Sequence, residues 1–128
     1  MAKPVVFITG GGRRIGAAIS SMLMDSGYFV LIHVRNSIDE AQAIISAHSA
    51  ANNGEISGDI IRADLVNDDI SQLIATIANH PKVIEYGGLF GLINNASVYQ
   101  PISFAELTFE EFKKLSLIHI SEPTRPPE

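Results

Sequence analysis

Residues 9–16, TGGGRRIG, combine glycines with two arginines in a way that could bind an anion. Glycine adopts backbone angles that other residues avoid, so Gly10 suits a tight turn. Gly16 would allow a following helix to pack closely. The free N–H groups and partial positive charge at a helix start suit phosphate oxygens. We therefore predict that this turn binds the phosphates of a nucleotide. The alternative is a tight strand-to-helix turn without a ligand.

A second polar segment, HVRNS at 33–37, shows which nucleotide would fit. Dinucleotide sites that bind a free ribose 2′-hydroxyl carry an acid at this place. This segment has no acid and contains Arg35, and Arg13 would project toward the same pocket. A 2′-phosphate repels carboxylates and pairs with guanidinium groups. The segment therefore favours NADP(H), although ordinary surface charge is the alternative for both arginines. The cofactor-binding residues predicted here are His33, Arg35, Asn36 and Ser37, and His33 could instead be a packed strand-end side chain.

Both segments follow short apolar runs, which are typical of strands buried on both faces of a parallel sheet. These strands are predicted at residues 4–9 and 28–34. A third and less regular strand is predicted at 56–63, where Gly58 and Asp59 interrupt it. A fourth is predicted at 89–94.

Helices are predicted between these strands. Apolar residues at helical spacing (Ile15, Ile19, Met22 and Leu23) indicate a first helix that stops at Gly27. Ser37 can cap the second helix. The third is predicted to start from Asn67 or Asp68 and to close at His80-Pro81. A last helix opens with the capping-box pair Thr108 and Glu111 and contains FEEFKK at 109–114.

This alternation predicts an α/β fold: the N-terminal part of a Rossmann-like doubly wound parallel sheet, with about four strands alternating with helices. Ligands of such folds bind at the carboxyl ends of the strands, where the strand order reverses. The turn after the first strand occupies that point, which places TGGGRRIG at the expected site.

Composition excludes several other classes of function. The 128 residues carry a net charge of −5, which argues against nucleic acid or an anionic membrane as partner. The absence of cysteine excludes disulfides and thiolate metal sites, and we predict no metal site. No signal peptide or membrane-spanning run is evident. We therefore expect a soluble, cytoplasmic protein.

Three motifs together resemble the short-chain dehydrogenase/reductase family: TGGGRRIG, ADL at 63–65 and NNAS at 94–97. They occur in the family's order, and the resemblance runs from about Pro4 to Phe112. It implies an oxidoreductase in which the glycine turn holds the cofactor phosphates, Asp64 meets the adenine and the NNA stretch borders the nicotinamide ribose. The cofactor residues on this reading are Gly10, Arg13, Arg14, Ile15, Gly16, Asp64, Leu65, Asn94, Ala96 and Ser97.

Two departures from the common family pattern resemble one branch. Arg14 stands where glycine is usual, and Ser97 replaces the glycine of NNAG. Both are similar to the pteridine reductase and dihydromonapterin or dihydrofolate reductase branch. That resemblance implies that Arg14 faces both cofactor phosphate and pterin, and that Ser97 borders the substrate. The expected function is NADPH-dependent reduction of a pteridine-type small molecule. The alternatives are a general carbonyl or 3-oxoacyl-type reductase and a non-catalytic NADP(H)-binding module.

The catalytic motif that the resemblance implies, Tyr-x-x-x-Lys, is not in this chain. The tyrosines are Tyr28, Tyr86 and Tyr99, and the residues four positions later are Ile32, Phe90 and Ser103. We therefore assign no catalytic residue and expect the chain alone to be inactive. Residues 1–114 are interpreted as the N-terminal cofactor-binding part of the domain.

The end of the chain has a different character. LSLIHISEPTR at 115–125 resembles the translation of a sequencing adaptor, so residues 115–128 are predicted to be a non-native tail. A natural irregular tail is the alternative. The family resemblance also implies that the parent protein is a homo-oligomer, either a dimer or a tetramer.

Overall fold

A computed structural model describes residues 2–95 of the chain. The predictions for Ala96, Ser97, Tyr99, the helix at 109–114 and the boundary at 114 lie outside the described residues. The elements, in chain order, are β1 (Val5–Thr9), α1 (Arg14–Asp25), β2 (Phe29–Val34), α2 (Ile38–Ala51), β3 (Gly58–Arg62), α3 (Ile70–Ala78), α4 (Pro81–Tyr86) and β4 (Gly91–Asn94).

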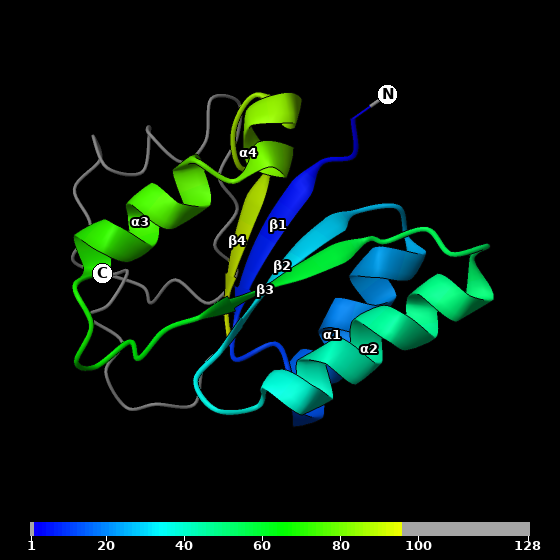
Figure 1. Ribbon diagram of the computed structural model, residues 1–128, viewed down its shortest axis with the longest axis horizontal. Coiled ribbons are helices and arrows are strands. Elements are labelled where there is room, and N and C mark those ends of the chain that lie inside the picture. Colours follow the sequence, from blue (N-terminus) through cyan, green and yellow to red (C-terminus); the bar gives the residue numbers. More distant parts are fainter. Residues whose placement is uncertain (1, 96–128) are drawn as a thin grey trace, which may run out of the picture.

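The strands form one parallel sheet in the order β3-β2-β1-β4. In the register, Phe7 of β1 pairs with Leu31 of β2 on one side and with Leu92 of β4 on the other. Helices α1 and α2 cover one face of the sheet, and α3 and α4 cover the other (Figure 1). This arrangement confirms the predicted α/β fold. The strand order reverses at β1, so the turn after β1 lies at the switch point.

Each face of the sheet has its own apolar cluster. Ile8, Ile32 and Met24 belong to the cluster beneath α1 and α2. On the opposite face, Leu31 and Ile77 belong to the cluster beneath α3 and α4. All residues of β1 and β2 are buried, because helices cover both faces. Burial on both faces explains why these strands appear as continuous apolar runs in the sequence.

Helix α1 packs on the sheet through one narrow face that begins with two small residues. Its buried residues are Gly16, Ser20 and Met24, which are spaced four apart and so lie on one face. Ile15 and Met22 are instead 70% and 58% exposed. The apolar spacing predicted the helix correctly, and its Ile19 and Leu23 pack against the cluster beneath α1, but it did not identify the fully buried residues.

The structure corrects the predicted start of α3 and the predicted break in β3. The N-cap of α3 is Asp69, whose Oδ1 accepts the N–H of Ser71 at 2.9 Å. It is neither Asn67 nor Asp68, because both belong to the preceding turn, where Asp68 Oδ2 accepts the N–H of Asp64 at 2.8 Å.

The predicted interruption at Gly58 and Asp59 was wrong, since both lie within β3. A Cβ on Gly58 would lie 3.1 Å from the carbonyl oxygen of Val30 and 3.3 Å from Ile45. Glycine therefore fits at this point because neighbouring strand and helix atoms leave little room, and the strand continues through it.

A short helix that the sequence analysis missed lies between α3 and β4. His80-Pro81 ends α3, as predicted, and also begins α4. His80 Nδ1 accepts the N–H of Lys82 at 3.1 Å, and Pro81 occupies the first turn, where its missing N–H costs nothing. The helix ends at Gly87, which has φ +98°.

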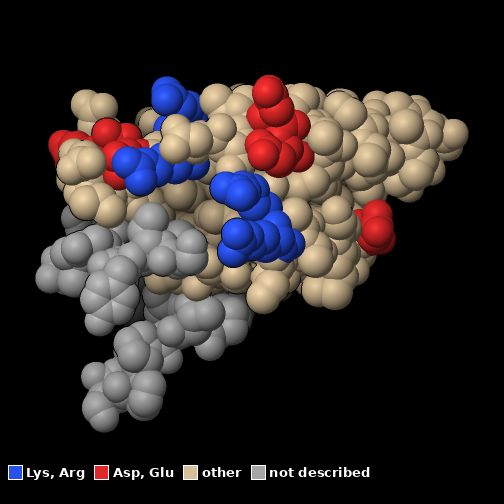
Figure 2. Space-filling view, turned by 90° about the horizontal axis from the view of Figure 1, so that it is seen from below, with Lys and Arg blue, Asp and Glu red and all other residues tan. Residues whose placement is uncertain are grey.

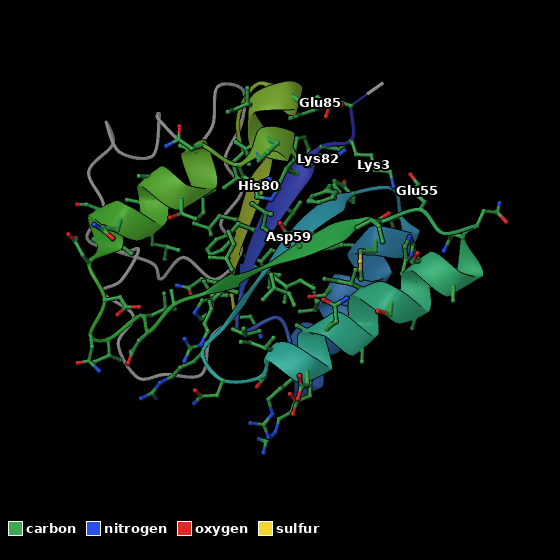
Figure 3. All side chains as sticks on the ribbon, viewed as in Figure 1. Lys3, Glu55, Asp59, His80, Lys82 and Glu85 are labelled. Atoms are coloured by element: carbon green, nitrogen blue, oxygen red, sulfur yellow. The ribbon has the colours of Figure 1, made fainter. Side chains whose placement is uncertain are left out.

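The amino ends of the strands carry a set of ion pairs, labelled in Figure 3. Lys3 Nζ lies 2.8 Å from Glu55, and its hydrogen bond lowers the pKa of that carboxyl. His80 Nε2 lies 2.8 Å from Asp59. Partly exposed pairs of this kind contribute little to stability individually. Both lysines of the described residues, Lys3 and Lys82, nevertheless belong to ion pairs of this kind.

We expect Asp69→Ala to lower the free energy of unfolding by about 1 kcal/mol, because α3 loses the side-chain cap at its first turn. Ser37→Ala is the control. Ser37 occupies the same position before α2, but its side chain makes no capping hydrogen bond. Urea denaturation of both variants checks the prediction, and equal losses would contradict it.

Candidate functional site

The turn after β1 is confined by the sheet beneath it. Gly10 has φ +64°, a conformation that favours glycine. A Cβ on Gly11 would lie 2.7 Å from Cγ2 of Ile8, and one on Gly12 would lie 2.8 Å from Cγ1 of Val34. The three glycines therefore allow the backbone to lie directly on the strand ends.

Hydrogen bonds fix the orientation of this turn. The N–H groups of Gly10 and Gly11 donate to Nδ1 and to the carbonyl oxygen of His33, at 2.9 and 3.1 Å. Ser20 Oγ donates to the Gly11 carbonyl at 2.9 Å, and Asn95 Nδ2 donates to the Gly10 carbonyl at 3.2 Å. The first part of the turn is thus held by β2, α1 and the residue after β4, so its shape does not depend on a ligand.

The second part of the turn leads into the N-terminus of α1. The N–H of Ala17 donates to the carbonyl of Arg13 at 3.1 Å. The N–H groups that precede Ala17 in the first turn have no acceptor within the helix. Arg13, the N-cap, makes no side-chain capping bond. Among residues 2–95, no acceptor pairs with these N–H groups, and N–H groups of this kind at a helix start suit a phosphate.

Arg14 occupies an unusual backbone conformation. Its φ is +53°, and only Asn53 shares a positive φ among the non-glycine residues that the structure describes. A left-handed conformation costs a residue with a Cβ about 1–2 kcal/mol. Such strain is concentrated at functional sites. The conformation also explains why glycine would be the less strained residue at this position.

Arginines gather at the carboxyl edge of the sheet. Figure 2 views the molecule from below, the side where the strands end in Figure 1, and shows Lys and Arg atoms grouped on that surface. Arg13 and Arg14 follow β1, Arg35 follows β2 and Arg62 ends β3. Together they are all the arginines of the described residues. Planar guanidinium groups bind phosphate through paired hydrogen bonds, so this edge suits a phosphorylated ligand.

Asp64, which follows β3, is held in a local turn. Its Oδ1 accepts the N–H of Val66 at 2.9 Å, and its Oδ2 accepts Nδ2 of Asn67 at 2.9 Å. These hydrogen bonds, that from Asn67 first, lower the pKa of the carboxyl. Arg35 lies 3.6 Å from Oδ2. Asp64 is thus an ionised, oriented carboxylate beside Arg35, and the adjacent Leu65 packs against the cluster beneath α3.

His33 is buried and both of its ring nitrogens have protein partners. Only 4% of the residue is exposed. Nδ1 receives the Gly10 N–H, and Nε2 lies 2.9 Å from the carbonyl oxygen of Ala63. Desolvation by burial lowers the pKa of His33. His33 is therefore a packed side chain near the end of β2, which was one of the two alternatives from the sequence. Its ring joins the glycine turn to the segment before Asp64.

The end of β4 is tied to the end of β1. Thr9 Oγ1 donates to Asn94 Oδ1 at 3.0 Å and accepts the N–H of Asn95 at 2.8 Å. Thr9, Ser20 and Asn95 were missed as site-supporting residues. The position of Ser20, four residues after Gly16 on the same helical face, was the signal available for one of them.

The structure brings most of the predicted site residues to one edge. The predicted residues of the glycine turn, those after β2 and β3, and Asn94 at the end of β4 all lie at the carboxyl ends of neighbouring strands. Tyr28 and Tyr86 lie elsewhere, with rings 5.8 and 6.3 Å from the ring of Phe90. Within residues 2–95, no group of histidine and acidic side chains is suited to hold a metal ion. No helix in that range is long and apolar enough to span a membrane.

Two known structures share this fold. An alternative dihydrofolate reductase 1, FolM, from Brucella suis, solved in complex with NADP, aligns with a TM-score of 0.60 and 33% identity over 76% of this chain and 37% of that one. A protein of Pseudomonas syringae, named a putative short chain dehydrogenase, aligns with a TM-score of 0.63 and 26% identity, covering 89% and 44% of the two chains.

Sequence relatives are oxidoreductases. Elsinochrome reductase 1 of Elsinoe fawcettii is 33% identical over 90% of this chain and 40% of its own length. The 3-oxoacyl-[acyl-carrier-protein] reductase FabG of Aggregatibacter actinomycetemcomitans is 27% identical over 86% and 43%. The chain thus spans about two fifths of the length of these relatives. The family model described as short chain dehydrogenase matches residues 4–121. The chain belongs to the short-chain dehydrogenase family.

Proposed function

We propose that the carboxyl edge of the sheet binds NADP(H), and that the chain is the cofactor-binding part of an NADPH-dependent short-chain reductase. One observation carries this proposal: the N-terminus of α1 and four arginines, which follow β1 and β2 or end β3, lie at the carboxyl ends of neighbouring strands. NADPH, when bound, supplies a hydride from its nicotinamide. The residues of this chain would bind and orient that cofactor.

Arg13 and Arg35 would bind the 2′-phosphate. Residues 35–37, directly after β2, contain no acid, although a carboxylate at this place would bind the 2′-hydroxyl. Arg35 pairs with Asp64 at 3.6 Å, with 57% of its side chain exposed. Exposed pairs are worth about 0–1 kcal/mol, whereas a hydrogen bond to a charged group is worth about 1.5–3 kcal/mol. Replacing the contact of Arg35 with Asp64 by a contact with a phosphate would therefore cost little free energy.

A pteridine-type substrate is the finer proposal, and Arg14 supports it. Arg14 keeps a strained conformation where glycine would be relaxed, so its side chain is expected to serve a purpose. We propose that Arg14 bridges cofactor phosphate and substrate, and that Ser97 borders the substrate. The similarity to a dihydrofolate reductase with bound NADP agrees with this assignment.

The second candidate is a reductase of carbonyl or 3-oxoacyl substrates, favoured by the similarity to FabG. The two candidates share the cofactor and differ in the substrate. A non-catalytic NADP(H)-binding module would share the cofactor site and show no turnover in any longer form of the protein.

We expect Arg35→Ala to weaken NADPH binding about tenfold or more, because a charge-assisted hydrogen bond to the 2′-phosphate is lost. NADH, which lacks this phosphate, should bind equally well to both proteins. Lys82→Ala is the charge-matched control, since Lys82 lies at the opposite edge on α4. Nucleotide fluorescence titrations measure all of these affinities. An equal loss for NADPH and NADH would contradict the phosphate assignment.

We expect Arg14→Gly to have opposite effects on stability and function. Removing the left-handed strain should raise the free energy of unfolding by about 1 kcal/mol. In a longer form that includes the Tyr-x-x-x-Lys segment, turnover of dihydropterin should fall far more than turnover of a simple ketone. Arg13→Gly is the matched control for stability, because Arg13 has an extended backbone and no strain to relieve. Equal losses on both substrates would contradict the bridging role.

A further inference from the structure

His33 forms a bridge between two loops of the proposed site. Its Nδ1 accepts the N–H of Gly10, and its Nε2 faces the carbonyl oxygen of Ala63, each at 2.9 Å. A carbonyl oxygen can only accept, so Nε2 carries a proton and donates it. An N–H can only donate, so Nδ1 carries no proton. A single neutral tautomer therefore satisfies both contacts.

The surroundings of the ring favour this neutral form. Phe7 of β1 meets the ring edge to face, and Ile61 of β3 lies opposite His33 in the register, so both flanking strands contribute uncharged groups. The charged groups at this edge are Asp64, Asp68, whose Oδ2 accepts the Asp64 N–H, the exposed arginines around the turn, and Asp39 and Glu40 in the first turn of α2. Desolvation lowers the pKa of His33, and this effect is larger than the opposing effects of the Ala63 carbonyl and Asp64.

We propose that His33 is a positioning residue whose neutral imidazole holds the phosphate-binding turn in shape, and whose protonation weakens cofactor binding. This inference rests on the proposed binding of NADP(H) at the turn. A proton on Nδ1 would face the Gly10 N–H, so two donors would oppose each other in a buried place. The Gly10 peptide would then have to turn away, and the N–H groups that follow it would lose their alignment with the phosphates.

The bridge extends to the adenosine side of the site. Ala63 immediately precedes Asp64, and its N–H donates to the carbonyl of Val34 at 3.0 Å. The imidazole thus connects the glycine turn with the segment that carries Asp64. Pre-organised contacts of this kind raise affinity because fewer groups must be ordered when the ligand binds. His33 therefore acts on the cofactor through the two loops rather than by touching it.

Two substitutions separate the parts of this bridge. In His33→Asn, the amide oxygen takes the place of Nδ1 and can still accept the Gly10 N–H, while the contact with Ala63 is lost. In His33→Gln, the longer side chain can donate to the Ala63 carbonyl, while the acceptor for Gly10 is lost. Neither amide titrates, so both variants also remove the pH response of the imidazole.

The experiment measures NADPH dissociation constants of the full chain from pH 8 to pH 5 by fluorescence titration. Because the pKa of folded His33 is lowered, wild-type affinity should fall more steeply than that of His33→Asn toward the acid end of this range. The cofactor's own phosphate also titrates near pH 6, and His33→Asn measures that contribution. At pH 8, His33→Asn should bind like wild type, and His33→Gln should bind about tenfold more weakly.

Urea denaturation provides a readout that needs no cofactor. Because the pKa of His33 is lower in the folded than in the unfolded chain, the unfolded chain takes up the proton first. The free energy of unfolding of the wild type should therefore be highest above pH 6.5 and should decrease as the pH falls below that value. In His33→Asn, this position should not contribute to the decrease. If His33→Gln does not fold, the comparison of wild type with His33→Asn still tests the proposed role of His33.

The outcomes are distinct. Identical pH profiles of binding for wild type and His33→Asn would overturn the role of His33, as would wild-type affinity of a folded His33→Gln at pH 8. Absence of NADPH binding by the wild-type chain at pH 8 would overturn the proposed function itself, and this inference with it.

Discussion

The close approach of α1 to the end of β1 is the constraint on which the rest of the site depends. A Cβ on Gly16 would overlap the carbonyl oxygen of Gly10 and lie 2.6 Å from Nδ2 of Asn95. With no side chain there, α1 begins directly above the strand end, and Ser20 reaches the Gly11 carbonyl from the next turn of the helix. The N-terminus of α1 consequently lies at the carboxyl end of β1. A larger residue at position 16 would move the helix and the proposed phosphate site together.

The polar groups at this edge have two different tasks. His33, Ser20, Thr9 and Asn95 bond to backbone or to each other and leave little for a ligand. The arginines around them are exposed and make weak or no ion pairs among the described residues. Internal hydrogen bonds thus shape the turn, while exposed guanidinium groups lie around it. The proposed phosphate site would therefore combine a backbone held by protein contacts with cationic side chains at the surface.

Charge is also divided between the two ends of the sheet. The lysines of residues 2–95 lie at the amino end in pairs with acidic groups, and the arginines lie at the carboxyl end (Figures 2 and 3). With a net charge of −5, the chain as a whole would repel a dinucleotide. At the carboxyl edge, where we propose that the cofactor binds, the arginines would offset that repulsion, because screening limits the reach of distant surface charges.

The sequence by itself determined the fold class, the order of the strands along the chain and the positions of the glycine turn and Arg35. It did so because strands buried on both faces and glycine-rich turns have strong local patterns. Only the tertiary structure decided which face of α1 is buried, that Gly58 continues β3, and that Asp69 caps α3, since each depends on atoms from other elements. The contacts of His33 also depend on the tertiary structure. Its two partners, Gly10 and Ala63, are 23 and 30 residues away in the sequence, and only the parallel register of three strands brings them to one imidazole.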